Sequence, residues 1–155
     1  MTSFYEPTSG IIEGAVHRYA VRVYYEDTDA GGVVYHANHL RWFERARSDM
    51  LRLLGIDQRS ALDAGEGMYA IADLTIRYLA PARLGDAVLV ETRIGTVRAS
   101  SCILQQNVSR DDVQLSEASV RVGFIGSDGR PKRQPRAWRE QLAALALDPK
   151  GQKFR

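Results

Sequence analysis

The chain has 155 residues, of which 45% are hydrophobic and 26% are charged, and its formal net charge is +2. This composition is that of one ordinary globular domain, long enough to bury roughly 70% of its unfolded surface. No stretch approaches the ~20 apolar residues that cross a membrane, and the small net charge does not indicate a general nucleic-acid binder. The N-terminal residues lack the features of a signal peptide, and Cys102 is the single cysteine. We therefore expect a cytoplasmic protein in which Cys102 is a small buried residue.

The first third of the chain predicts a strand followed by one long helix. Residues 1–13 are polar and are expected to form a loose leader. Partial alternation of apolar residues predicts a strand over Val16–Tyr25. Apolar residues then recur at intervals of three and four, which predicts an amphipathic helix from Asn38 to Leu54, ended by Gly55. The residues that define this apolar stripe are Leu40, Phe43, Ala46, Met50, Leu51 and Leu54. A second, short helix is expected over 57–64.

The remainder of the chain is rich in Val, Ile, Leu and Thr, with turn residues at intervals. This pattern predicts four further strands, over Met68–Tyr78, Asp86–Val97, Ser101–Ser109 and Gln114–Ile125. A hairpin turn is expected at 110–112, and the part from 130 to 155 is expected to form a basic loop and a helix near Pro135–Leu147. A strand, a long helix, consecutive strands and a last helix indicate one α+β domain over 1–155.

An acidic turn separates the first strand from the long helix. Its residues, Asp27-Thr28-Asp29-Ala30-Gly31-Gly32, favour a bend of the backbone. The turn brings carboxylates next to the start of a helix, where backbone N–H groups without partners carry partial positive charge. An aspartate in this position is commonly a turn or capping residue, and the residues alone do not distinguish that role from a chemical one.

The turn and the helix together resemble the signature of a known family. The matching elements are Arg22-Val23, then Thr28-Asp29, Gly32-Val33-Val34 and His36. They resemble the 4-hydroxybenzoyl-CoA thioesterase family, and EDTDAGGVVYHAN followed by RWFERAR is most similar to its Tol-Pal-associated acyl-CoA thioesterases. The similarity extends over roughly residues 17 to 138 and includes APARLGD at 80–86. The resemblance implies a hotdog fold, in which an antiparallel sheet wraps around one long helix, and hydrolysis of an acyl-CoA thioester.

The resemblance also implies roles for individual residues. Asp29 corresponds to the catalytic carboxylate, either as nucleophile or as general base, and the backbone N–H of His36 corresponds to the donor that binds the thioester oxygen. Whether the His36 imidazole also takes part is left open. Glu26 and Asp27 do not match the motif and are interpreted as turn and surface groups. Asn38 is expected to be the helix N-cap rather than a catalytic residue.

Further expectations concern metals, cofactors and partners. His36 and His39 are three residues apart, yet the chain has no HExxH pattern, and we expect neither a metal site nor a cofactor beyond the CoA of the substrate. His39 also departs from the aromatic residue found there in many relatives. The resemblance implies a homodimer or homotetramer with the site between subunits, completed by partner residues around Met68–Thr75. An acyl carrier protein is a further candidate partner.

A basic segment near the C-terminus has two interpretations. Five basic residues and no acidic residue occur between Arg130 and Arg139, and they are Arg130, Lys132, Arg133, Arg136 and Arg139. They form either an exposed solvated surface or a binding site for the phosphates of CoA.

Two other functions remain open from the sequence. One is a non-catalytic module of the cell envelope that binds acyl-CoA or acyl carrier protein, and the other is a hotdog hydratase. The carboxylate of Asp29 favours the hydrolase, since a binding module has no need of it.

Overall fold

The computed structural model describes residues 5–146, which form one six-stranded sheet, three α-helices and a short 3-10 helix. The elements in chain order are β1 (Ile11–Glu13), β2 (Val16–Arg22), η1 (Tyr25–Asp27), α1 (His36–Leu53), α2 (Gln58–Asp63), β3 (Met68–Tyr78), β4 (Ala87–Val97), β5 (Ser101–Arg110), β6 (Val113–Ile125) and α3 (Arg136–Ala146). The α+β class predicted from the sequence is confirmed.

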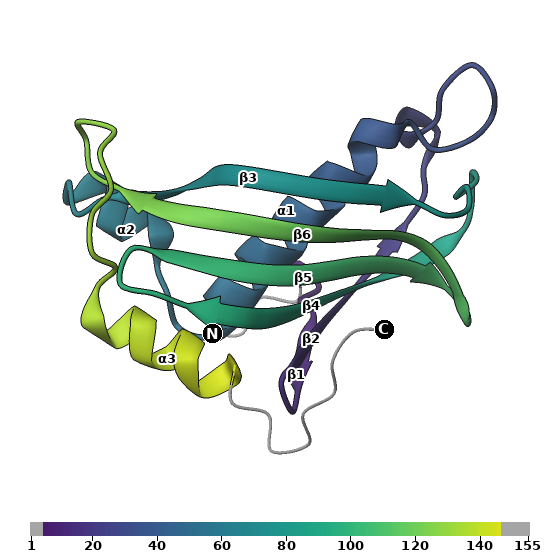
Figure 1. Cartoon of the computed structure of the whole chain (residues 1–155). Helices are drawn as coiled ribbons and strands as arrows, with labels where there is room; N and C mark the ends of the chain where they lie inside the picture. The colour runs from purple at the N-terminus through teal and green to yellow at the C-terminus, as the bar shows by residue number, and fades with distance from the viewer. Residues whose placement is uncertain (1–4, 147–155) are drawn as a thin grey trace.

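The sheet has the strand order β1-β2-β4-β5-β6-β3, and each pair of neighbours is antiparallel (Figure 1). Strands β4, β5 and β6 follow one another through hairpins, whereas β3 crosses over to pair with β6. Strand β3 is therefore an edge strand with a neighbour on one side.

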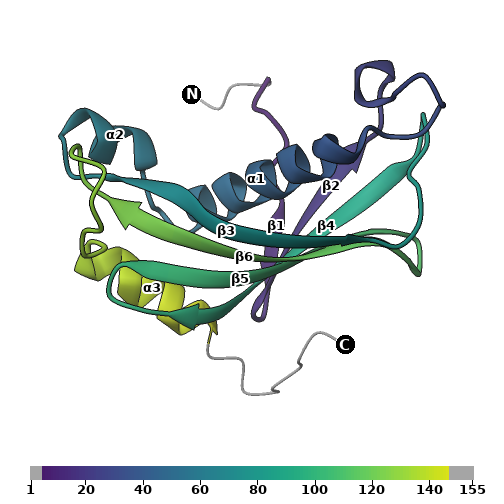
Figure 2. The ribbon, with the colours of Figure 1, turned by 45° about the horizontal axis from the view of Figure 1, so that its top comes forward.

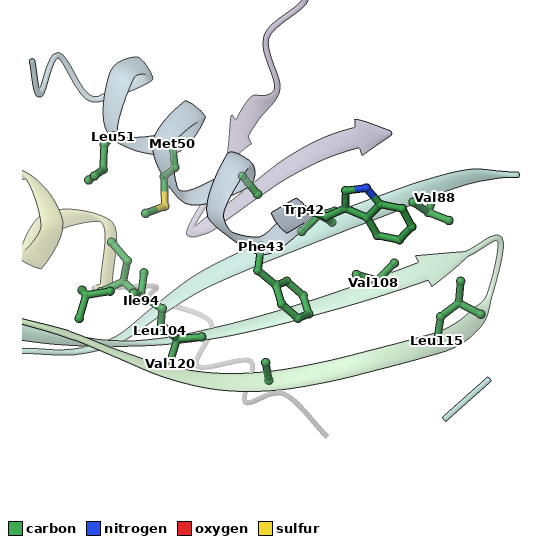
Figure 3. Packing of buried hydrophobic residues seen from close by; sticks show 14 of the residues in the cluster. Trp42, Phe43, Met50, Leu51, Val88, Ile94, Leu104, Val108, Leu115 and Val120 are labelled. Atoms are coloured by element: carbon green, nitrogen blue, oxygen red, sulfur yellow. The ribbon is translucent and has the colours of Figure 1, made fainter. Parts of the chain in front are cut away.

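Helix α1 lies across one face of the curved sheet, as Figure 2 shows. The helix supplies Trp42, Phe43 and Met50 to the core, where they face strand residues that include Val88, Leu104 and Val120 (Figure 3). Phe43 is fully buried. Removing this much aromatic and aliphatic surface from water is the main favourable contribution to folding of such a domain. The expected arrangement, an antiparallel sheet around one long helix, is confirmed.

Helix α1 ends one residue before the predicted Leu54 and begins two residues before the predicted Asn38. Leu53 is its last residue, and Gly55 follows with φ +78°, a conformation that glycine adopts without steric cost. The predicted N-cap at Asn38 is wrong, because the helix starts at His36 after Tyr35. Asn38 is the third helical residue and is buried, so its side chain bonds a distant group rather than the helix terminus.

The N-terminal part differs most from expectation. Within the predicted leader of 1–13, residues Ile11–Glu13 form β1 and pair with β2. A strand of three residues has too few side chains to show an alternating pattern, and pairing with β2 supplies its stability. The predicted strand Val16–Tyr25 ends at Arg22 because η1 begins at Tyr25. Residues 1–4 and 147–155, including the end of the predicted C-terminal helix, lie outside the described residues.

Helix α3 packs at the end of the sheet where the second half of α1 lies (Figure 1). Its Leu142 is buried in the same hydrophobic core as Met50 and Leu51. The helix therefore closes the end of the core opposite the acidic turn. Across residues 5–146, no helix has both the length and the apolar character needed to cross a membrane.

Candidate active site

The acidic turn folds back on itself just before α1. Thr28 and Val34 form an isolated antiparallel bridge, and the Asp29 N–H donates to the Val33 carbonyl at 2.9 Å. Between them the Gly32 N–H donates to the Asp29 carbonyl at 3.1 Å, with Gly32 at φ +77°. A residue with a side chain is strained at this φ, which explains why the turn requires a glycine there.

The carboxylate of Asp27 fixes the two ends of the turn. Its oxygens accept hydrogen bonds from the Tyr24 N–H and the Asn38 amide, both at 2.8 Å, and its carbonyl accepts one from the Tyr35 N–H at 2.8 Å. One residue thus joins the end of β2 to the first turn of α1. The interpretation of Asp27 as a turn group agrees with this geometry, although the sequence offered no sign of its bond to Asn38.

The loop between β3 and β4 packs against the acidic turn and stabilises it. The Val34 N–H donates to the Ala82 carbonyl at 2.8 Å, and Val33 bridges to Arg83. An ion pair of 2.7 Å between Asp86 and Arg110 stabilises this loop. Hydrogen bonds from the Arg83 N–H and the ion pair with Arg110 lower the pKa of the Asp86 carboxyl. The APARLGD segment therefore serves the turn as its scaffold.

Asp29 lies at the exposed side of this turn. Its Oδ1 accepts a hydrogen bond of 2.8 Å from the Gly31 N–H, so the side chain is oriented by the backbone of its own loop. The structural role of an aspartate in a turn is thus real here, and it is compatible with a chemical role for the second carboxylate oxygen.

His36 is the first residue of α1, and its N–H belongs to the group of helix-starting amides that have no partner within the helix. Its imidazole is exposed and contacts the rings of Tyr35 and Tyr78, with centroids 4.5 Å and 6.2 Å away. The turn and the helix start lie together at one end of the molecule (Figure 1). The structure therefore brings Asp29 and His36 to the same end of the molecule.

His39 lies one turn further along α1 and points into the protein. Its Nδ1 is 2.7 Å from the Ser116 hydroxyl of β6, and 3% of the residue is exposed. Burial, with a smaller contribution from His36, lowers the pKa of His39 to about 4. His36 and His39 thus occupy different environments, and within residues 5–146 no three His, Cys, Asp or Glu side chains gather closely enough to hold a metal ion.

Two residues near the helix start were not identified from the sequence. Ser116 binds His39, and the Tyr78 hydroxyl donates to the His36 carbonyl at 2.8 Å. Both come from strands more than thirty residues away along the chain. The sequence carries no local pattern that would assign them to this end of α1.

A cavity of about 310 Å³ lies under the second half of α1, between that helix and the start of β3. Its wall is mostly apolar and includes Met50, Leu51, Met68, Ile71 and Leu104. Polar groups are few, and Glu44, Arg47 and Gln58 are among them. Because α1 rises 1.5 Å per residue, Met50 lies roughly 20 Å along the helix from His36. Within one chain the cavity and the acidic turn are therefore separate.

The predicted CoA-phosphate residues lie at the end of the sheet where β3 begins. The Lys132 ammonium donates to the Glu66 carbonyl at 2.6 Å, and Arg136 pairs with Glu140 at 2.9 Å. Arg130 and Arg133 are exposed in the same segment. Since the acidic turn adjoins the other end of β3, one chain does not bring these cations to Asp29.

Comparison with known proteins assigns the family. A model of the thioesterase-like superfamily matches residues 23–145. A probable thioesterase from Bartonella henselae aligns in structure with a TM-score of 0.73 and 31% identity, over 77% of this chain and 99% of that one. A 4-hydroxybenzoyl-CoA thioesterase bound to its substrate aligns with a TM-score of 0.75 at 20% identity, over 83% and 99%, a likeness of fold. The chain belongs to the thioesterase-like superfamily and has its hotdog fold.

The chain is also similar, over most of its length, to two bacterial thioesterases. It is 42% identical to the acyl-CoA thioesterase YbgC of Haemophilus influenzae over 107 residues, or 69% of this chain and 79% of that protein. It is 41% identical to the acyl-CoA thioester hydrolase YbgC of Escherichia coli over 128 residues, or 82% and 92%. Both alignments cover most of the relative, so the similarity is one of whole domains. The protein is an enzyme of the thioesterase class.

The buried His39 predicts a pH-dependent loss of stability. Between its ordinary pKa of 6.5 and about 4, the unfolded chain binds a proton at this residue and the folded chain does not. The free energy of unfolding should therefore fall as the pH is lowered through this window. His39→Phe should flatten the dependence, measured by urea unfolding at several pH values from 7.5 to 4. An identical slope in both proteins would show that His39 is not the group responsible.

Proposed function

We propose that this thioesterase hydrolyses an acyl-CoA thioester, with Asp29 as the catalytic carboxylate and the His36 N–H as the donor to the thioester oxygen. The observation that supports this most directly is that an exposed, backbone-oriented carboxylate lies in the turn that leads into the first amides of α1. The YbgC relatives, at 41–42% identity, support CoA as the thiol. Both roles have a physical basis in the turn, because Asp27 and Ala82 hold its two sides in place.

The proposed reaction needs two functions at one carbonyl group. Asp29 either attacks the acyl carbon and forms an anhydride, which water then cleaves, or removes a proton from the attacking water. In both routes the C–S bond breaks, CoA leaves as the thiolate and takes up a proton, and the fatty or aromatic acid is released. Negative charge grows on the carbonyl oxygen beforehand. Donation from the His36 N–H, at the positive end of the helix dipole, stabilises that charge.

Replacing Asp29 by Asn should abolish hydrolysis while leaving substrate affinity largely unchanged. The amide keeps the size of the carboxylate but neither attacks the thioester nor accepts a proton, so we expect kcat to fall on the order of 10²–10⁴-fold. Turnover is measured by release of free thiol from a panel of aliphatic and aromatic acyl-CoA thioesters, and affinity by calorimetry.

Glu26→Gln is the matched control, because it removes another exposed carboxylate three residues earlier. This variant should keep wild-type turnover. If Glu26→Gln is inactive and Asp29→Asn is active, the catalytic carboxylate is Glu26 and the proposed role of Asp29 is wrong. Loss of activity in both would point to the general charge of the turn instead.

We further propose that the acyl group binds in the cavity of a second copy of the chain. Strand β3 is an open edge of eleven residues, and it exposes apolar side chains including Met68 and Ile71. Such an edge pairs readily with a copy of itself in antiparallel fashion. Antiparallel pairing puts the end of one β3 beside the start of the other. The acidic turn of each chain would then face the cavity of its neighbour across the interface.

Mixing two inactive variants tests this arrangement. Ala70→Trp fills the cavity, which Ala70 lines, and Asp29→Asn removes the carboxylate. If each site combines groups from two chains, hybrid dimers contain one intact site, and random mixing by denaturation and refolding restores about a quarter of the wild-type rate. If each site lies within one chain, no hybrid has an intact site and the mixture stays inactive. Size-exclusion chromatography with light scattering reports whether dimers or tetramers form.

The same symmetry supports the basic segment as the site of the CoA phosphates. Antiparallel pairing of β3 would place the basic segment of one chain near the acidic turn of the other. Arginine is well suited to phosphate because its guanidinium donates two parallel hydrogen bonds. Lys132 and Arg136 already contact Glu66 and Glu140, so Arg130 and Arg133 are the better candidates for binding.

Replacing Arg133 by Gln should raise KM for an acyl-CoA severalfold, as expected for the loss of one charge-assisted phosphate contact. The KM for the corresponding N-acetylcysteamine thioester, which has no phosphate, should stay the same. Arg59→Gln is the control, since Arg59 is a highly exposed arginine of α2 paired with Asp63. An equal rise in KM for both thioesters would argue for an effect on the acyl site rather than on phosphate binding.

A further inference from the structure

The last residue of β3 is fastened to the first turn of α1. Tyr78 donates its hydroxyl hydrogen to the His36 carbonyl at 2.8 Å. Its ring lies edge-on to the rings of His36 and His39, with centroids 6.2 Å and 5.2 Å away. The side chain thus contacts both the backbone and the side chains of the helical residues that begin α1.

A second contact to the same turn comes from the neighbouring strand. Tyr78 is the direct cross-strand partner of Ser116, whose hydroxyl is 2.7 Å from His39 Nδ1. Two paired residues of the sheet therefore hold the helix at its first and fourth positions. Two such attachments on one helical turn fix both its rotation about the helix axis and its position along that axis.

The hydrogen bond from Tyr78 also acts on the helix amides. The His36 carbonyl shares a peptide group with the Ala37 N–H, which follows the His36 N–H at the helix start. A donor on that carbonyl polarises the peptide and makes its N–H a stronger donor, by about 10–30% in hydrogen-bond strength. Partial burial raises the pKa of the Tyr78 phenol, so the hydroxyl keeps its proton at neutral pH.

From these contacts we propose that Tyr78 is a positioning residue for the thioester-oxygen site. It holds the first turn of α1 so that the His36 and Ala37 amides face the carbonyl oxygen of the substrate. This inference rests on the proposed role of the His36 N–H. Tyr78 acts through the helix and takes no part in proton transfer.

Tyr78→Phe is the variant that tests the proposal, because it removes the hydroxyl and keeps the ring. One net hydrogen bond contributes about 0.5–1.5 kcal/mol, so kcat should fall between about twofold and tenfold while KM changes little. Tyr19→Phe is the matched control, since Tyr19 is a half-buried tyrosine of β2 that packs against the core. It should leave kcat unchanged.

A binding measurement separates positioning from a structural effect and from the chemistry of Asp29. S-acetonyl-CoA carries a ketone oxygen, and S-propyl-CoA has the same three-carbon chain without that oxygen. The wild-type protein should bind the ketone more tightly, and Tyr78→Phe should reduce that preference while leaving affinity for S-propyl-CoA unchanged. Asp29→Asn should retain the preference, because the amides that bind the oxygen are intact.

The outcomes distinguish the two hypotheses. An unchanged kcat and an unchanged ketone preference in Tyr78→Phe would overturn the positioning role. The positioning role would also be overturned if Tyr78→Phe bound S-acetonyl-CoA and S-propyl-CoA more weakly by the same factor, or if Tyr19→Phe showed the same fall in kcat/KM. Either result indicates a general structural effect. Normal turnover in Asp29→Asn, with a reduced ketone preference in Tyr78→Phe, would refute the role of Asp29 and support that of Tyr78.

Discussion

The hydrogen bonds of Asp27 are the constraint on which the geometry of the site depends. A helix that begins beside a glycine-rich turn has no intrinsic reason to start at a fixed residue, since helix ends fray easily. Here the side chain of Asp27 binds Asn38 inside the helix and the Tyr24 N–H before the turn. These two bonds join residues close together in the chain, so they close the loop without contacts from the sheet. The carboxylate of Asp29 and the amide of His36 are consequently presented by one small, locked unit.

Asp27 and Asp29 differ in the hydrogen bonds that their carboxylates accept. Both carboxylate oxygens of Asp27 accept hydrogen bonds that hold the turn together, and Asp27 is only partly exposed. Asp29 is exposed, and a hydrogen bond of 2.8 Å from the Gly31 N–H orients it. A carboxylate that is oriented but not saturated with donors retains an oxygen for chemistry. The two aspartates, two positions apart, therefore differ in their hydrogen bonds, and this difference supports the proposal that Asp29 is the catalytic carboxylate.

Much of the fold could be predicted because its signals are local. The apolar stripe that places Phe43 and Met50 on one face of α1, and the stop at Gly55, both depend on residues close together in the chain. Strand β1 could not be predicted, because it exists through pairing with β2 rather than through its own three residues. The N-cap was misassigned for a similar reason, since the partner of Asn38 is eleven residues away.

The candidate site shows the same division. A family motif identified Asp29 and His36, and the structure brings both to one end of the molecule, although their chemical roles stay proposals. Tyr78 and Ser116 were missed because they approach α1 through the sheet. The sequence also could not predict that the basic segment and the cavity lie at the far end of β3, because this arrangement depends on how β3 crosses to pair with β6.

Strand β3 leaves a row of backbone donors and acceptors open along the edge of the sheet, next to uncovered apolar side chains such as Met68 and Ile71. A newly synthesised chain would expose this aggregation-prone edge until another surface covers it. If copies of the chain pair along this edge, as proposed, a high concentration of chains favours that pairing, whereas a low concentration or a high temperature leaves time for mismatched pairing and precipitation. The yield of soluble material should therefore depend on how quickly copies meet, as much as on how well each one folds.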